Sequence, residues 1–318
     1  MADRTLYDAM TWEDISVGAT AAGDSSISVG EVGDSGPLVL ITAGVHGDEG
    51  PWGAWAIRKV LDRIPMSDLE GRVRVVPVTN PVAMASDRRC ADMDSLDLNR
   101  VFPGKEDGTH TERLAALLKD RLLADHVDAA VDLHGGGSWC VNSFAFSFPG
   151  DEELALAADA PFIVERPPAD GPPTSLTACA AEAGARITAW EMGGRSGREE
   201  EWAERIADGL QRVLSIAGAI STAPPPRTIE DPIYLEGLSV ITPSRGGVLV
   251  PKLREAAIGT VVDRGTWLGS LVHPATFEEL ERFEAPFEKT ALLLIRNQLM
   301  VLNSGDMTYV IGDVKAPE

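Results

Sequence analysis

The sequence predicts an α/β fold, with a mainly parallel or mixed sheet flanked by helices, followed by a small C-terminal all-β domain. Continuous apolar runs alternate with segments of helical periodicity up to about residue 216, which is typical of alternating strands and helices. Beyond the linker-like, proline-rich residues 221–226, the apolar runs become short and are broken by Gly and Pro. We therefore expect two domains, covering residues 1–222 and residues 229–318.

Buried strands are predicted from apolar runs that are bounded by turn residues. Their continuous apolar character suits parallel strands that are covered on both faces. The runs of the first domain are residues 37–42, 72–78, 127–133 and 186–190, with a further strand expected over 142–148. The short runs of the second domain are residues 238–242, 247–250, 257–262, 266–271, 292–295 and 307–311.

Helices are predicted between the strands of the first domain from apolar residues at helical spacing. Pro51 suits the first turn of a helix, where its missing N–H is not needed. The predicted helices cover residues 51–64, 111–124, 152–158, 174–184 and 199–216. Residues 80–109 are rich in charge, Gly and Pro and show no period, so we expect a long ordered loop. Loops of this length inside a compact domain are usually either functional or disordered.

Composition narrows the class of protein. The 318 residues are 44% hydrophobic and 24% charged, which is close to globular usage, and the formal net charge is −21. Such a charge repels polyanions, so nucleic acid and an anionic membrane surface are discounted as partners. Three cysteines, an odd number without a C-x-x-C pair, fit a reducing compartment. The first residues have no basic and apolar signal pattern, so we expect a cytoplasmic protein.

Four candidate site residues follow predicted strands directly. His46 and Glu49 follow the first strand, His134 follows residues 127–133, and Glu191 follows residues 186–190. The carboxyl ends of parallel strands meet at one edge of a sheet, where ligands bind in α/β folds. Each residue by itself could be a packing or surface residue, but two imidazoles and one carboxylate form a zinc ligand set that leaves a fourth position open.

The long loop adds cations. Asn99 and Arg100 stand side by side, and Arg88 and Arg89 lie upstream. An arginine fork can bind a carboxylate through two parallel hydrogen bonds. A solvated loop is the alternative, because aspartates are interleaved with these arginines.

Together these motifs resemble the succinylglutamate desuccinylase/aspartoacylase family of the zinc carboxypeptidase-like superfamily. The resemblance rests on residues 46–49 (His-Gly-Asp-Glu), 80–81 (Asn-Pro), 97–104 (Asp-Leu-Asn-Arg-Val-Phe-Pro-Gly), 132–134 (Asp-Leu-His) and 191–193 (Glu-Met-Gly). The motifs run in family order, and the C-terminal β region is also similar, so nearly the whole chain is covered. The loop between Arg89 and Asn99 is longer than in the compact desuccinylases, which weakens the transfer of their substrate.

The resemblance implies roles for the site residues. It implies one Zn2+ per subunit, bound by His46, Glu49 and His134, with Glu191 as general base. It further implies Asn99 and Arg100 as a clamp on a substrate carboxylate. An upstream arginine would stabilise the oxyanion. Arg89 matches the spacing expected for this role, and Arg88 remains possible for it. Arg88 is otherwise expected to bind substrate.

The activity expected from these residues is hydrolysis of a small N-acyl amino acid, of N-acetyl or N-succinyl type, by a metal-activated water. Glu191 would take the proton of that water and return it to the leaving amine. Asp132 either orients a ligand or supports the structure. The alternatives are a zinc carboxypeptidase acting on peptides and a non-catalytic binding protein, although the presence of Glu191 argues against the latter. A homo-oligomer is compatible with the sequence.

Overall fold

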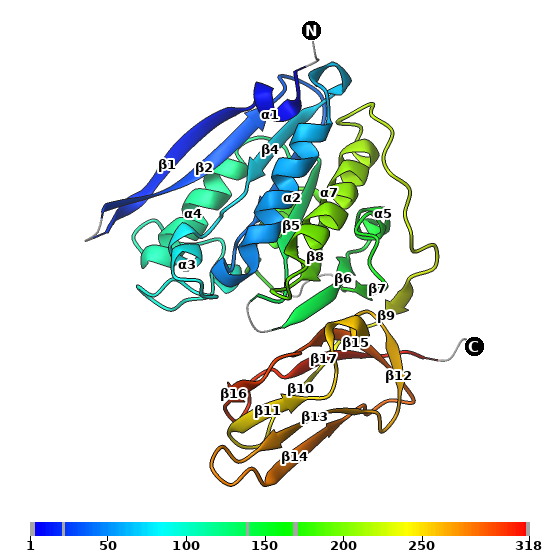
Figure 1. Ribbon diagram of the computed structural model, residues 1–318. Helices are drawn as coiled ribbons and strands as arrows, with labels where there is room; N and C mark the ends of the chain where they lie inside the picture. The colour runs from blue at the N-terminus through cyan, green and yellow to red at the C-terminus, as the bar shows by residue number, and fades with distance from the viewer. Residues whose placement is uncertain (1–3, 21–22, 138–139, 168–170, 316–318) are drawn as a thin grey trace.

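The computed structural model describes residues 4–20, 23–137, 140–167 and 171–315. Within these ranges the strands form two sheets, one of 13 strands and one of four (Figure 1). No helix in the described part of the chain is long and apolar enough to cross a membrane.

The centre of the large sheet is parallel, as predicted. Its four strands are β3 (Leu38–Ala43), β4 (Arg72–Val76), β5 (Ala129–His134) and β8 (Arg186–Gly193). β3 pairs in parallel with β4 and β5, and β5 pairs in parallel with β8. Every residue of β3 and β5 is buried. This explains the continuous apolar runs, since both faces of these strands are covered.

Helices cover the two faces of this sheet. The longer helices are α2 (Gly50–Arg63), α4 (His110–Leu122), α6 (Leu176–Glu182) and α7 (Glu199–Ile216). α2 and α7 contribute to one apolar core and lie side by side in Figure 1, whereas α4 and α6 contribute to a second core. α4 starts at a capping box formed by Thr109 and Glu112, which satisfies free backbone N–H groups. The predicted helices are confirmed, with ends that differ by a few residues.

Shorter elements complete the first part of the chain. They are the helices α1 (Leu6–Ala9), α3 (Pro81–Ala85) and α5 (Glu152–Leu156), and the 3-10 turns η1 (Gly47–Glu49), η2 (Met66–Asp68) and η3 (Leu98–Arg100). Further strands extend the sheet on both sides: β1 (Thr11–Thr20) and β2 (Gly23–Val32) beyond β4, and β6 (Val141–Ser147) and β7 (Phe162–Glu165) beyond β8, with β7 parallel to β6. The pairing of β6 with β8 is antiparallel, so the sheet is mixed.

The C-terminal region is rich in antiparallel strands, which confirms the predicted all-β texture. The four-stranded sheet contains β11 (Gly247–Pro251), β13 (Trp267–Val272), β14 (Glu279–Glu284) and β16 (Met300–Leu302). The other strands are β9 (Ile233–Leu235), β10 (Ser239–Ile241), β12 (Val261–Asp263), β15 (Lys289–Ile295) and β17 (Tyr309–Asp313), with the turn η4 (Glu255–Ala257). These strands join the large sheet, because β15 pairs with β6 and β9 pairs with β7. The division at residues 222–229 stays a prediction.

The proline-rich residues 221–226 are held against the first part of the chain. The buried Arg212 of α7 donates hydrogen bonds to the carbonyl oxygens of Pro225 at 2.9 Å and Pro226 at 3.0 Å. Asp159 accepts hydrogen bonds from the backbone N–H groups of Thr228 and Ile229. The segment therefore has the composition of a linker but is bound along its length.

Replacement of Arg212 tests this attachment. Arg212→Met removes the charged donor from the carbonyl oxygens of this segment, and we expect the free energy of unfolding to fall by about 2–3 kcal/mol. Chemical denaturation measures the change. Arg227→Met, in an exposed part of the same segment, is the control and should have little effect. Equal stability of Arg212→Met and the wild type would show that the segment is not held by this side chain.

Candidate metal and active site

The first motif is built by a tight turn at the end of β3. His46 precedes the 3-10 turn Gly47–Glu49, which leads directly into α2. A Cβ atom at Gly47 would lie 2.0 Å from the backbone carbon of Ala83, so only glycine allows this approach. The N–H of Gly47 donates to the carbonyl oxygen of Arg88 at 2.9 Å. The turn is thus fastened to the loop that carries the predicted arginines.

His46, Glu49 and His134 come together at the carboxyl edge of the sheet. One ligand atom from each lies within 4.8 Å of the others, and all three residues are buried. Oε2 of Glu49 is 3.0 Å from Nδ1 of His46 and 3.1 Å from Nδ1 of His134. Among the described residues, this is the one cluster of its kind that could hold a metal ion.

A carboxylate lies behind each imidazole. Nε2 of His46 is 3.1 Å from Oδ1 of Asp97, and Nε2 of His134 is 2.9 Å from Oδ2 of Asp132. Thr42 on the neighbouring strand donates to the other oxygen of Asp132 at 2.7 Å. Metal-binding histidines have partners of this kind, which orient the ring and leave the other nitrogen for the metal. Of the two readings of Asp132, the geometry therefore favours orientation of His134.

The opposite charges of the buried cluster stabilise one another. Burial opposes the charge of Glu49, but the two histidines outweigh it and lower the pKa of Glu49. Burial likewise opposes the charge of His134, but Asp132 and Glu49 outweigh it and raise the pKa of that imidazole. Two imidazole nitrogens that converge on one buried carboxylate, each backed by an acid, form a donor set that fits divalent zinc.

Glu191 lies beside this cluster at the end of β8, where it is the register partner of His134 on β5. Burial and the nearby Glu49 raise the pKa of Glu191. The side-chain amide of Asn142, on β6, donates to Oε2 of Glu191 at 2.7 Å. A carboxylate with a raised pKa that is fixed by a single donor has the properties of a general base.

The structure separates the two adjacent arginines. Arg89 donates to Oδ2 of Asp97 through Nη2 at 2.9 Å and approaches Oε1 of Glu49 to 3.3 Å. Arg88 has 68% of its side chain exposed and pairs with Asp92 at 3.2 Å. The cavity described next is lined by Arg89 and not by Arg88.

A cavity of about 210 Å³ opens onto these groups. It is lined by His46, Glu49, His134 and Glu191, by Asn142 and Arg89, and by Asn99, Arg100 and a further arginine, Arg166. The buried Oδ1 atom of Asn99 has no hydrogen-bond partner within the described residues. Asn99 and Arg100, both predicted, are thus brought to the same cavity as the cluster.

Arg166 was not among the predicted site residues. Its guanidinium lies over the ring of Phe146, with 4.4 Å between the carbon of the guanidinium and the ring centroid. Burial and the nearby Arg100 lower its pKa. In the described part of the chain, neither Arg166 nor Arg100 has a carboxylate within 4.0 Å. Two neighbouring cations without an acid therefore face one cavity.

Three functional positions were missed in the sequence. Asp97 begins the motif at residues 97–104 but had no predicted role of its own, although its place beside Asn99 could have suggested a partner for a histidine. Asn142 begins a predicted strand, and a polar residue beside apolar Val141 was a weak signal. Arg166 follows β7 in a proline-rich stretch, and nothing local distinguishes it.

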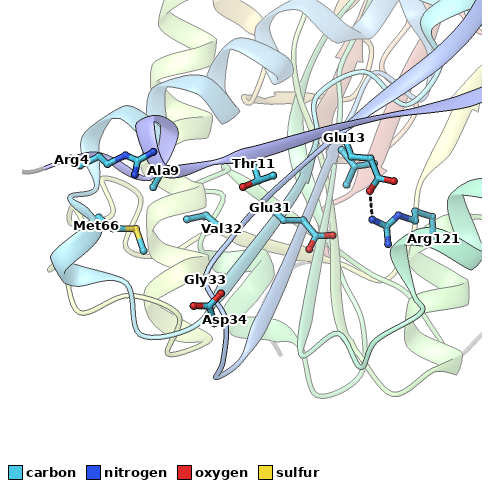
Figure 2. A pocket seen from close by; sticks show the side chains of 11 residues that line it. Arg4, Ala9, Thr11, Glu13, Glu31, Val32, Gly33, Asp34, Met66 and Arg121 are labelled. Carbon is cyan, nitrogen blue, oxygen red and sulfur yellow. Dashed lines mark hydrogen bonds and ion pairs between the residues drawn. The ribbon is translucent and has the colours of Figure 1, made fainter.

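A larger cavity, of about 520 Å³, lies at the β1–β2 ribbon and is separate from this chemistry (Figure 2). Two of the acids that line it are paired with arginines. Glu13 accepts from Arg121, and Glu31 accepts from the buried Arg74 at 2.7 Å. It contains no metal cluster within the described residues, so the smaller cavity is the candidate site.

Part of the chain is similar to a deacetylase of known activity. Over 102 residues the chain is 43% identical to N-alpha-acetyl-L-2,4-diaminobutyric acid deacetylase from Halomonas elongata, a segment that covers 32% of this chain and 29% of that relative. The matched segment is thus less than a third of the length of that relative.

Solved structures match almost the whole chain. A succinylglutamate desuccinylase from Silicibacter sp. TM1040 has a TM-score of 0.80 and 24% identity, with 96% of this chain and 95% of that chain covered. The product-bound Ectoine utilization protein EutE (DoeB) from Ruegeria pomeroyi has a TM-score of 0.79 and 23% identity, with the same shares covered. At these identities the likeness shows a common fold.

The sequence also matches a model of a protein family. Residues 35–217 match the family described as the succinylglutamate desuccinylase/aspartoacylase catalytic domain. This match covers more than half of the chain and includes His46, Glu49, His134 and Glu191. The chain therefore belongs to the succinylglutamate desuccinylase/aspartoacylase family.

Proposed function

We propose that this protein is a zinc-dependent amidohydrolase that releases the amino acid from a small N-acyl amino acid. The observation that carries the proposal is one cavity that joins a His-Glu-His cluster, a buried carboxylate beside it and two arginines that have no carboxylate partner among the described residues. The partial likeness to a deacetylase supports the same reaction. The small volume of the cavity favours small amides over peptides, because ligand pockets for larger molecules typically start at about 300 Å³.

His46, Glu49 and His134 would hold the metal. When bound there, zinc supplies Lewis acidity, which polarises a carbonyl oxygen and makes water more acidic. Asp97 and Asp132 keep the Nδ1 atoms of the two histidines directed at the site, because their hydrogen bonds occupy Nε2.

Glu191 acts as general base and then as general acid. Asn142 donates to Oε2, which fixes the carboxylate and leaves Oε1 to take the water proton. Glu191 then gives the proton to the former amide nitrogen. The amine can leave as a neutral molecule only after this nitrogen is protonated. Its raised pKa brings the carboxylate closer to the pH at which both transfers are efficient.

The arginines of the cavity have two different roles. Arg89 is held by Asp97 and reaches the cluster, so it can stabilise the negative charge that develops on the carbonyl oxygen. Arg100, Arg166 and the Asn99 amide bind the substrate carboxylate at the other part of the cavity. We place the reaction in the cytoplasm, in keeping with three free cysteines.

Glu191→Gln tests the general base. The variant keeps the shape and a hydrogen-bonding group but cannot accept a proton, so we expect kcat to fall by about 100- to 10,000-fold. The bound zinc should be unchanged. Assays with N-acyl amino acids and elemental analysis measure both quantities, and Glu165→Gln, exposed at the end of β7, is the matched control. Wild-type turnover in Glu191→Gln would remove this residue from the mechanism.

His134→Ala tests the metal ligands. Loss of one of three protein ligands should lower the zinc content of the purified protein, measured by elemental analysis. His126→Ala, at an exposed position, controls for the loss of an imidazole. An unchanged zinc content in His134→Ala would exclude it as a ligand, whatever the activity of the variant.

The carboxylate clamp is tested by Arg100→Ala and Arg166→Ala. Each removes a charge-assisted hydrogen bond, so we expect KM to rise by about tenfold or more while kcat changes less. Arg88→Ala is the control, because that side chain lies on the surface. A KM that rises in Arg88→Ala but not in Arg100→Ala would reverse our assignment of the arginines.

A further inference from the structure

The C-terminal region supplies an apolar part of the cavity. Five of its side chains line the cavity, and we call them the apolar wall: Leu238, Val240, Leu294, Met307 and Val310. Phe144 and Phe146 of β6 extend this surface from the first part of the chain. Most of these residues belong to one apolar cluster in which β6 and β7 meet β15 and β17. The wall is therefore part of a packed core rather than a loose cover.

The carboxylates in the described part of the cavity already belong to the proposed metal and base site. Glu49 and Glu191 are the carboxylates that line its described part, and both lie at the metal cluster. Asp97 and Asp132, which lie behind the cluster, bind the two histidines. A substrate ammonium group in this cavity would thus find no free carboxylate among the described residues. Burial of a charge without a partner is costly, so the cavity disfavours a cationic substituent.

The cations of the cavity suit one anionic group. Arg100 and Arg166 are neighbours, and neither has a carboxylate partner in the described part of the chain. A single carboxylate between them relieves their mutual repulsion and uses both forks. A second carboxylate on the substrate would then have to lie against the apolar wall.

From this arrangement we propose that the substrate carries one carboxylate and one uncharged, apolar substituent that packs against Leu238, Val240, Leu294, Met307 and Val310. The substituent is either the amino-acid side chain or the acyl chain. The C-terminal region then determines specificity, while the first part of the chain carries out the reaction. This inference rests on the proposed deacylase function and adds the class of substrate.

Matched substrates test the inference on the zinc-loaded full chain. One series keeps the N-acetyl group and varies the amino acid: alanine, leucine, aspartate and 2,4-diaminobutyrate. The other keeps alanine and varies the acyl group: formyl, acetyl and butyryl. We expect kcat/KM to rise by about tenfold along one series, which identifies the source of the apolar substituent.

The charged substrates separate the possible outcomes more clearly, because the expected difference in kcat/KM is larger. For N-acetylaspartate and N-acetyl-2,4-diaminobutyrate we expect a kcat/KM on the order of 100-fold below that of N-acetyl-leucine or N-butyryl-alanine, because their charge must be buried on an apolar surface. A preference for either charged substrate would overturn this inference and leave the deacylase function standing. Failure to cleave any of these amides would count against the proposed function itself.

Two valines of similar exposure make a matched pair of variants. Val240 on β10 is 46% exposed and lines the cavity, whereas Val250 on β11 is 41% exposed and does not. Val240→Asp should lower kcat/KM for the preferred apolar substrate by about tenfold or more and improve the relative rate for the diaminobutyrate derivative. Val250→Asp should leave both values unchanged. An unaltered preference in Val240→Asp would refute the role of the apolar wall.

Binding provides a readout that does not depend on turnover. In the Glu191→Gln background, calorimetry should rank the dissociation constants of the same compounds in the order of their kcat/KM values, with the apolar substrate tightest. Equal dissociation constants for leucine, aspartate and diaminobutyrate derivatives would contradict selection by the wall.

Discussion

The Glu49 carboxylate, held between two imidazoles, is the interaction on which the site depends. Its Oε2 atom is close to Nδ1 of both His46 and His134, although the histidines are far apart in the sequence. They meet because β3 and β5 are parallel neighbours, with Ala43 opposite Leu133, so the residues after each strand reach the same edge. A buried carboxylate is stable only when positive charge compensates it, which ties the position of Glu49 to the two histidines and Arg89.

The same requirement explains why the long charged loop is ordered. Asp97 binds His46 and Arg89 at once, and Asp94 accepts hydrogen bonds from both the backbone and the hydroxyl of Thr111. The acids of the loop are therefore acceptors in a network, not only solvated surface charges. Through this network the loop brings Asn99 and Arg100 to the cavity.

The C-terminal region meets the cavity at β15. β15 pairs with β6, where Leu294 lies opposite Asn142. Leu294 belongs to the apolar wall, and Asn142 holds Glu191. Leu294, which lines the cavity, and Asn142, which donates a hydrogen bond to Glu191, are thus neighbours in one ladder of hydrogen bonds. The C-terminal strands therefore support the cavity as well as lining part of it.

Local patterns in the sequence predicted much of the fold. The four central strands follow from continuous apolar runs, and α7 follows from its helical periodicity, because both are local consequences of burial. β1 was not predicted; it is largely exposed and contains no continuous apolar run, so it lacks the pattern of the central strands. The pairing of β15 with β6 joins segments about half the chain apart, which no local pattern reports.

The sequence by itself determined the α/β class, the all-β texture of the C-terminal region and the candidate residues His46, Glu49, His134 and Glu191, because strand ends and polar motifs are local features. Only the tertiary structure decided that Arg89 and not Arg88 faces the cavity, that Asp97 backs His46, and that Arg166 and the apolar wall join the site. These facts depend on the direction of a side chain or on contacts between distant segments, which are set by packing.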